Sequence, residues 1–202
     1  MEREMEKELE DEVSRWREER YRERLSRIGI PTRYADATDA RAEELAERLV
    51  SGGATGLYVY GDVGSGKTWL ACSVLRRAAR RERYQPRAFG AVSMLSSLRA
   101  SYDGRQGVTV EELERADMLL VDDLDKPRFT PWALETLYEV VNARVENGRP
   151  TIVTANSDMG GLAERLSAID PVLAEAICDR LVGGAIAVRM EGESRRRWLD
   201  AE

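Results

Sequence analysis

Gly61-Asp62-Val63-Gly64-Ser65-Gly66-Lys67-Thr68 is the stretch of the chain that decides its fold. It matches the pattern G-x-x-x-x-G-K-[ST] of a phosphate-binding loop, which joins a strand to a helix. The apolar run 57–60 predicts the strand, and the periodic run 69–80 predicts the helix. A glycine-rich turn that matches by chance is the alternative, and the flanking strand and helix argue against it.

The residue types of this loop fit a chain of phosphates. Glycines at 61, 64 and 66 let the backbone pass close to phosphate oxygens and turn its N–H groups toward them. Lys67 supplies a cation for the β- and γ-phosphates, Thr68 supplies a hydroxyl for Mg²⁺, and the helix adds its positive N-terminal dipole. Nucleotide contacts are therefore expected from Gly61, Asp62, Val63, Gly64, Ser65, Gly66, Lys67 and Thr68.

A second apolar run delivers two acids. Residues 118–121 read as a strand and are followed by Asp122 and Asp123, and the ligand sites of open parallel sheets lie outside the carboxyl ends of the strands. Asp122 is expected to hold Mg²⁺ through a hard oxygen ligand, and Asp123 to polarise the attacking water. The alternative for this pair is a strand that leaves the core into solvent.

A polar amide follows the strand expected at 151–154. Asn156 in this place would orient the attacking water or sense the γ-phosphate. Asn is also a favoured turn residue, so its meaning depends on the phosphate loop and the two acids.

Composition limits the class of protein. A chain of 202 residues is long enough for one full α/β domain with a short extension. It has no apolar run of membrane-spanning length, and its N-terminus is charged from Glu2 onward, so we expect no membrane helix, no signal peptide and a cytoplasmic location. With no histidine, imidazole acid–base chemistry is excluded, and Cys72 and Cys178 are expected to be buried thiols rather than zinc ligands. The net charge of −6 argues that any nucleic-acid contact is local.

Strands and helices alternate along the chain, which predicts a parallel sheet covered on both faces. Helices are expected at 40–50, with Thr38 or Asp39 as cap, and from Thr130 and Pro131 as cap and first residue to about 146. Strands are expected at 57–60, 88–92, 118–121, 151–154 and 185–188, and the other helices at 69–80, 93–102, 110–115, 162–166 and 171–181.

The first 28 residues read as a highly charged helix with a narrow apolar stripe. Met5, Leu9, Val13 and Trp16 recur at helical spacing, and Gly29-Ile30-Pro31 ends the helix. We divide the chain into an arm, residues 1–28, and a domain, residues 29–202. The arm is either a docking element for a partner protein or a solvated helix that packs on its own domain.

Three longer stretches carry a resemblance to a known family. With the phosphate loop, the runs LLVDDLD (119–125), LYEVVNARVENGRPTIVTANSDM (137–159) and ICDRL (177–181) resemble the AAA+ ATPases of the DnaC/IstB type, over about residues 30–197. That family comprises replicative helicase loaders and transposition helper ATPases. The resemblance implies ATP and Mg²⁺ as cofactors and a five-stranded parallel sheet of the additional-strand P-loop class, here with little or no C-terminal lid.

The resemblance also implies roles for individual residues. Lys67 and Thr68 match Walker A, Asp122 and Asp123 match Walker B, and Asn156 matches sensor 1. Arg180 matches the arginine finger offered to a neighbouring subunit; the alternative is a pair with Asp179 that caps a helix end. Arg196 matches the sensor 2 arginine, although Arg195 stands where an aromatic is usual, and Arg195 or Arg197 are the neighbouring choices. Asp123 stands where many relatives have Glu, which is expected to slow hydrolysis.

The expected function is that of an ATP-dependent loader that binds single-stranded DNA and a hexameric replicative helicase, assembled into a ring or spiral with shared ATP sites. The alternatives are a transposase-helper ATPase on double-stranded DNA and a non-hydrolysing, ATP-sensing adaptor. Arg99, Tyr102 and Arg105 are the expected DNA contacts, because they offer two cations and a stacking ring. The alternative there is a packing helix with a solvated basic edge.

Overall fold

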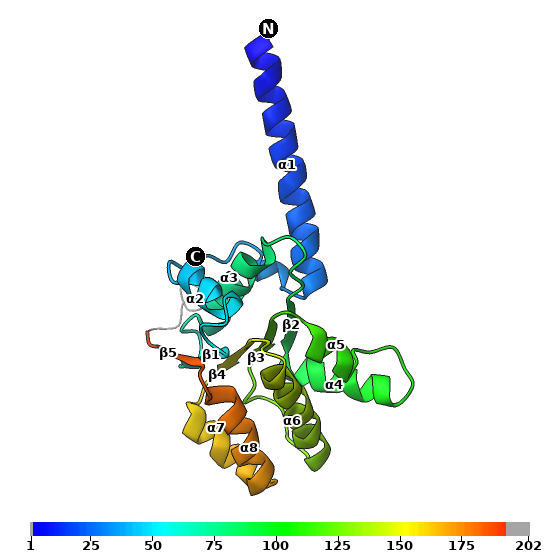
Figure 1. The fold of residues 1–202 in the computed structure, drawn as a ribbon, viewed down its shortest axis with the longest axis vertical. Helices are drawn as coiled ribbons and strands as arrows, with labels where there is room; N and C mark the ends of the chain where they lie inside the picture. The colour runs from blue at the N-terminus through cyan, green and yellow to red at the C-terminus, as the bar shows by residue number, and fades with distance from the viewer. Residues whose placement is uncertain (1, 193–202) are drawn as a thin grey trace, which may run out of the picture.

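One parallel sheet organises the molecule. The computed structural model describes residues 2–192, with the side chains of residues 2–8 and 10 left aside. The five strands lie in the order β2-β3-β4-β1-β5, and every neighbouring pair is parallel (Figure 1). Their bounds are β1 Gly56–Gly61, β2 Arg87–Gly90, β3 Leu119–Asp122, β4 Thr151–Ala155 and β5 Ile186–Met190. The predicted five-stranded parallel sheet is confirmed.

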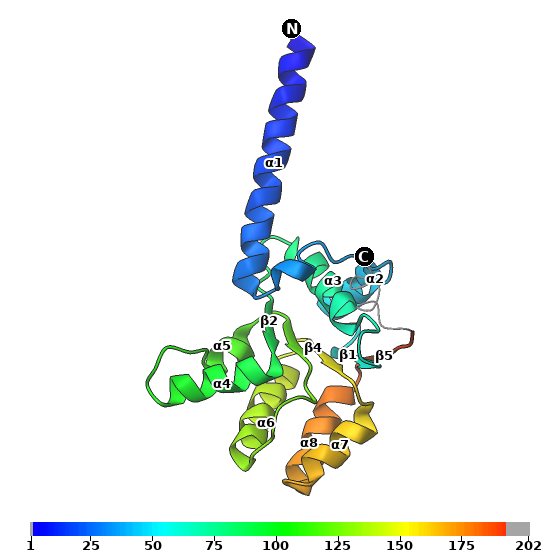
Figure 2. The same cartoon turned by 180° about the vertical axis from the view of Figure 1, so that it is seen from behind.

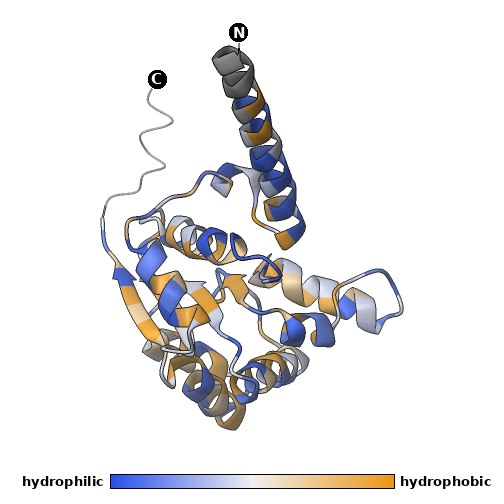
Figure 3. Ribbon diagram, turned by 45° about the horizontal axis from the view of Figure 1, so that its top comes forward, coloured by the Kyte–Doolittle hydropathy of each residue, from blue (hydrophilic) through white to orange (hydrophobic). Residues whose placement is uncertain are grey.

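Alternate residues of the strands face two separate cores, as the period of two in a strand requires. Leu57 and Val59 of β1 face the core shared with α2 and α3, whereas Tyr58 faces the core shared with α4 to α8. Figure 3 shows apolar residues along the sheet and on the helix faces that meet it. The helices are α1 Glu2–Ile28, α2 Ala42–Val50, α3 Lys67–Ala79, α4 Ala91–Tyr102, α5 Val110–Arg115, α6 Pro131–Glu146, α7 Met159–Ser167 and α8 Pro171–Val182, with a short 3-10 helix at Thr32–Tyr34.

Helix α1 leaves the body of the molecule (Figures 1 and 2). Its C-terminal end is packed: Leu25 and Ile28 are buried in the core, and the Tyr21 hydroxyl donates to the Arg76 carbonyl at 2.8 Å. Further out, Leu9 and Trp16 are 61% and 56% exposed. At 1.5 Å per residue, the 27-residue helix is about 40 Å long. The helix ends at Gly29, whose φ of 98° favours glycine.

Three element boundaries differ from the expectation. Strand β2 ends at Gly90, and Ala91 and Val92 belong to α4, because Gly90 is the N-cap and Ala91 is buried on the helix face. Helix α2 starts at Ala42, with Arg41 rather than Thr38 or Asp39 at its N-cap position. The Asp39 carboxylate lies just before the helix and accepts from the Arg41 backbone N–H at 3.0 Å and from the Arg41 guanidinium at 2.9 Å. Helix α7 starts at Met159, three residues early, with Asp158 as its cap.

The cap of α6 and the state of the two cysteines are as expected. Thr130 accepts from the Ala133 N–H at 3.2 Å, and Pro131 is the first residue of α6. Cys72 and Cys178 are buried free thiols, and burial raises the pKa of Cys72 to about 12. Within residues 2–192, no helix combines the length and apolar character that crossing a bilayer requires.

Candidate functional site

The phosphate loop runs from the carboxyl end of β1 to the first turn of α3. Gly61 has φ 136°, and a Cβ there would lie 2.0 Å from the Met190 carbonyl oxygen of β5, so no larger residue fits. Gly66 caps α3 with φ 97°, a left-handed conformation that leaves the N–H groups of the first turn available. The loop thus ends at a helix N-terminus, which favours an anion.

Lys67 is held inside the loop. Its Nζ donates to the carbonyl oxygens of Gly61 and Asp62 at 2.8 and 2.7 Å, and the residue is 6% exposed. Burial lowers the pKa of Lys67, and the carboxylates of Asp123, Asp125 and Asp122 oppose that effect. The ammonium group therefore stands beside the loop backbone, where a phosphate chain would lie.

A buried hydroxyl in the same loop supports the fit to phosphate. Ser65 Oγ is buried and has no hydrogen-bond partner within residues 2–192. Buried hydroxyls are normally paired, so this donor fits a phosphate oxygen as its acceptor.

Thr68 and Asp122 meet as the Mg²⁺ assignment requires. Thr68 Oγ1 donates to Asp122 Oδ1 at 2.9 Å, so a hydroxyl and a carboxylate oxygen from α3 and β3 lie side by side. Thr154 of β4 donates to the same Asp122 oxygen at 2.6 Å and fixes the carboxylate. Hard oxygen ligands on one or two side chains, completed by phosphate and water, are what Mg²⁺ takes at phosphate sites, so these residues fit the metal.

Asp123 follows directly and is set by its backbone. Its φ of 56° is left-handed, an uncommon conformation for a non-glycine residue, and its N–H donates to Thr154 Oγ1 at 2.8 Å. Burial and the neighbouring Asp122 carboxylate raise the pKa of Asp123. A carboxylate with a raised pKa is a better proton acceptor, which suits a residue that polarises water.

Asn156 lies at the end of β4, the strand between β1 and β3. Its backbone N–H donates to Asp125 Oδ2 at 3.0 Å, and its side-chain Nδ2 lies 3.5 Å from Asp125 Oδ1. The strand order therefore places Asn156 between the phosphate loop and the acids. Sequence reasoning missed Thr154 and Asp125, whose roles depend on β4 being the neighbour of β3.

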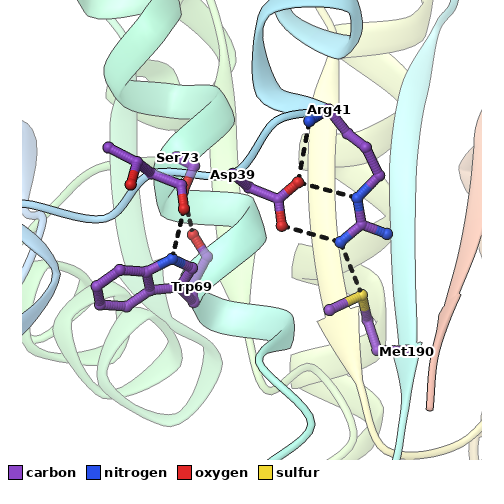
Figure 4. A network of polar contacts seen from close by, with 6 residues as sticks. Asp39, Arg41, Trp69, Ser73 and Met190 are labelled. Carbon is purple, nitrogen blue, oxygen red and sulfur yellow. Dashed lines mark hydrogen bonds and ion pairs between the residues drawn. The ribbon is translucent and has the colours of Figure 1, made fainter. Parts of the chain in front are cut away.

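The chain before α2 is fastened beside the loop (Figure 4). Trp69, the residue after Thr68, donates from Nε1 to the Thr38 carbonyl at 2.8 Å. Arg41 bonds to Asp39 at 2.9 Å and contacts the Met190 sulfur at 3.5 Å. These bonds hold the segment between α1 and α2 against the first turn of α3 and the end of β5.

Arg180 lies away from its own phosphate loop. Its Nε donates to Asn142 of α6 at 2.8 Å, its NH1 is 3.3 Å from Asp179, and its guanidinium lies 5.5 Å from the centre of the Tyr138 ring. The carbonyl of Gly183, the C-cap of α8, accepts from the Thr55 hydroxyl, which lies just before the start of β1. The phosphate loop follows the other end of β1. Six strand residues span about 20 Å, so Arg180 cannot serve the phosphates of its own chain. Its role as a finger for a neighbour stays a prediction.

Of the three expected DNA residues, Arg99 lines a groove, whereas Tyr102 and Arg105 do not. Arg99 stacks 4.9 Å from the centre of the Trp132 ring, and Tyr102 meets the same ring edge-on at 6.2 Å. The groove has a volume of about 390 Å³ between α4 and the start of α6, and its lining includes Arg99, Lys126, Arg128 and Trp132. Arg105 lies beyond it and pairs with Asp103 at 2.7 Å. The sequence does not predict Lys126, Arg128 and Trp132 as groove residues. They lie beside α4 only because of how the chain folds, and no local pattern indicates that contact. Arg196, with Arg195 and Arg197, lies outside the described residues.

The strand order and the site together define the class. A phosphate loop on β1, acids on β3 and a polar amide on the strand between them are the arrangement of a P-loop, ATP-binding AAA+ protein. More narrowly, the chain belongs to the family of IstB-like ATP-binding proteins, whose family model matches residues 8–200. The resemblance to the DnaC/IstB type is confirmed.

Curated relatives with similar sequences include insertion-sequence ATP-binding proteins. The chain is 33% identical over 146 residues to a "Putative insertion sequence ATP-binding protein y4pL" of Sinorhizobium fredii, covering 70% of this chain and 56% of that protein. It is 31% identical over 142 residues to a "Putative ATP-binding protein Rv3427c in insertion sequence" of Mycobacterium tuberculosis, covering 68% and 54%. The chain thus spans about half the length of these curated relatives.

Solved structures share the fold. The structure described as "Crystal Structure of the DnaI" superposes with a TM-score of 0.66 at 24% identity, over 83% of this chain and 95% of that one. The "DnaC helicase loader" structure gives 0.62 at 22% identity, over 80% and 100%.

Proposed function

We propose that the protein is an ATP-hydrolysing switch that binds single-stranded DNA and delivers a hexameric replicative helicase to it. The observation that carries the proposal is the segment 122–128, which begins at the acids of the ATP site and ends in the groove with Lys126 and Arg128. Nucleotide and nucleic acid would therefore be bound at two ends of one short segment. A protein with this role would act in the cytoplasm.

Hydrolysis is supported by the geometry of the acids. Asp122 and Thr68 would hold Mg²⁺, Lys67 would hold the β- and γ-phosphates, and Asp123 would orient and deprotonate the attacking water. Mg²⁺, when bound, neutralises charge that develops on the phosphates. The short Asp123 side chain is expected to give slow turnover.

Steady-state phosphate release tests this assignment. Asp123→Asn should bind ATP with near-normal affinity and lose hydrolysis, because a water-orienting acid acts mainly in the transition state. Lys67→Ala should lose tight binding, because Lys67 contacts phosphate in the ground state. Equal turnover by Asp123→Asn and the parent would refute the role given to Asp123, and a parent that binds ATP but releases no phosphate would leave the ATP-sensing adaptor.

Single-stranded rather than duplex DNA is favoured by the groove. Three cations, Arg99, Lys126 and Arg128, can follow a phosphate backbone, and Trp132 offers a ring on which an unpaired base can stack. Bases in a duplex are already stacked and cannot use such a ring. The open groove also lies on the same edge of the sheet as the ATP site, because α4 and the segment 123–130 both follow the carboxyl ends of strands.

Salt-dependent binding of labelled oligonucleotides tests the groove. Trp132→Ala should cost about 1–3 kcal/mol of single-strand binding free energy through lost stacking. Lys126→Ala and Arg128→Ala should each reduce, by about one, the slope of the logarithm of the binding constant against the logarithm of the salt concentration. Arg115→Ala is the matched control, since Arg115 is paired with Glu111 and does not line the groove. Unchanged affinity in all three groove variants would refute the site.

A second candidate function is a transposase helper on double-stranded DNA. It is favoured by the insertion-sequence relatives, which are the curated proteins with 31–33% identity. Gel shifts with single- and double-stranded DNA, each with and without ATP, separate the two functions. ATP-dependent binding to duplex alone would establish the helper and remove the loader.

A further inference from the structure

One turn is shared by the ATP site and the groove. The Lys126 N–H donates to the Asp123 carbonyl at 3.0 Å, which closes residues 123–126 into a turn. Asp123, at one end, is the acid beside the phosphate loop, and Lys126, at the other end, lines the groove. Lys126 is close enough to Asp123 to lower its pKa against the larger effect of burial.

The turn is fastened to β4 at three successive residues. Asp123 N–H donates to the Thr154 hydroxyl at 2.8 Å, and Leu124 N–H donates to the Thr154 carbonyl at 2.8 Å. The third attachment is the Asp125 carboxylate, which accepts from the Asn156 backbone N–H at 3.0 Å. Only this third attachment is made by an ionised side chain, and charge-assisted bonds to a carboxylate are stronger than neutral ones.

The contact between the side chains of Asn156 and Asp125 is weaker than the bond from the Asn156 backbone N–H. Asn156 Nδ2 lies 3.5 Å from Asp125 Oδ1, at the limit of a hydrogen bond. A γ-phosphate oxygen is an acceptor of the same kind and charge, so it can compete with Asp125 for this amide. The backbone bond keeps Asp125 attached to Asn156 while the amide changes partner, so the turn is loosened but not released. With ATP bound, Asn156 would then have a choice between two acceptors, one on the nucleotide and one in the turn.

We propose that Asp125 is a positioning residue that couples the nucleotide state, read by Asn156, to the position of Lys126 and Arg128 in the groove. The inference rests on the proposed function. When the Asn156 amide turns to the γ-phosphate, the turn loses one of its bonds to β4 and the two cations shift. DNA affinity then depends on which nucleotide is bound, and by linkage DNA changes ATP affinity by the same factor.

The test is the ratio of single-strand affinities measured with a non-hydrolysable ATP analogue and with ADP, using labelled oligothymidylate. The parent should show a ratio of about 5 or more, the lower range of measured allosteric couplings. Asp125→Ala should bring the ratio close to one in a protein that still binds both nucleotides, because the contact that links Asn156 to the turn is lost. Asp125→Asn keeps an acceptor without the charge and should give an intermediate ratio, which also covers the case in which the alanine variant folds poorly.

Asp158→Asn is the matched control. Asp158 is an acid close to the same part of β1, since it and Asp125 both raise the pKa of Tyr58, and asparagine retains its role as cap of α7. This variant should keep the parent ratio. A parent ratio retained in Asp125→Ala, or lost equally in Asp158→Asn, would overturn the inference while leaving the proposed function standing. A parent that binds DNA and ATP with a ratio of one would also overturn it, whereas a parent that binds no DNA would refute the proposed function itself.

Discussion

The expected catalytic base, Asp123, lies in an environment that opposes its ionisation. Asp123 must be ionised to accept a proton, yet it is half-buried next to Asp122, and both effects raise its pKa. As pH falls, a carboxyl with a raised pKa takes up its proton earlier than an ordinary Asp, which titrates near about 3.9. The ATPase should therefore lose activity at a higher pH than an unperturbed aspartate would predict.

Lys126→Gln tests this pH dependence. Lys126 lowers the pKa of Asp123, so its removal should raise that pKa and move the acid limb of the kcat profile to higher pH. The profile is measured without DNA, so that the groove does not contribute. Arg105→Gln, whose charge is paired with Asp103, should leave the limb in place. An identical limb in Lys126→Gln and the parent would remove Asp123 as the titrating base.

Arg144 shows how one buried cation ties three elements together. It is 0% exposed and donates to the carbonyls of Leu113, Ala116 and Pro150 and to the Thr151 hydroxyl, at 2.6 to 3.0 Å. Burial lowers its pKa to about 10, so it remains charged at neutral pH. Its guanidinium thus joins α6 to the end of α5 and to the start of β4.

Replacing Arg144 should destabilise the fold. Arg144→Met leaves several buried acceptors unpaired and should cost about 3–5 kcal/mol of unfolding free energy, measured by urea denaturation. Arg149→Met is the control, because Arg149 bonds one carbonyl, that of Glu114, and is partly exposed. It should cost about 1 kcal/mol. Equal losses in the two variants would contradict the role given to Arg144.

At this scale the sequence predicts residues that carry a local signature and misses those defined by neighbours. Thr68 and Asp122 lie 54 positions apart and were assigned from motifs, and the structure puts their oxygens 2.9 Å apart. Thr154, Asp125 and Trp132 have no such signature. Their partners come from other elements, so only the strand order and helix packing reveal them.

The elements were predictable in kind and less so at their ends. Every expected strand and helix is present within residues 2–192. The spacing of apolar residues distinguishes a helix from a strand when the segment is long enough to show its period. The predicted end of β2 was wrong because residues 88–92 are small or apolar and fit a strand or a helix equally well. Asp39 is not at the N-cap position because residues 40 and 41 form a turn before α2, and the Asp39 carboxylate accepts from the Arg41 backbone N–H in that turn.

Helix α1 changes how its proposed docking role should be tested. Residues 1–28 were expected to form one arm, and Leu25 and Ile28 lie in the core of the body. Removing them would expose apolar surface worth about 1.5–3 kcal/mol per side chain and would confuse docking with stability. The exposed part of α1 includes Leu9, Val13 and Trp16.

Deleting residues 1–16 should therefore abolish capture of the purified replicative helicase of the same host and spare ATP affinity. Trp16→Ala with Leu9→Ala in the full chain should weaken capture in the same direction, because apolar anchors carry such contacts. Leu25→Ala is the control for stability: it should lower the melting temperature and leave capture intact below it. Capture that survives the deletion would move the contact to another surface.

At the scale of the whole molecule, two cations expected to act on ATP lie far apart within residues 2–192. Lys67 lies in the phosphate loop, while Arg180 lies toward the opposite edge of the sheet and contacts Asn142 and Tyr138. Arg180 is partly exposed, so a neighbour can reach it without unfolding α8. A cation given by one subunit to the γ-phosphate of the next would complete the site in a ring or spiral.

Mixing two inactive variants tests this shared site. Lys67→Ala has a dead pocket and an intact finger, whereas Arg180→Ala has an intact pocket and should lose about 10³ to 10⁵ in rate, as for other arginine fingers. In a random one-to-one assembly, half of the pockets are intact and half of those face an intact finger, so hydrolysis should recover to about a quarter of the parent rate. Asn142→Ala releases Arg180 from its contact within the chain and should remain active. Full activity of Arg180→Ala alone, or no recovery in mixtures that co-assemble, would show that Arg180 acts only as the partner of α6 within its own subunit.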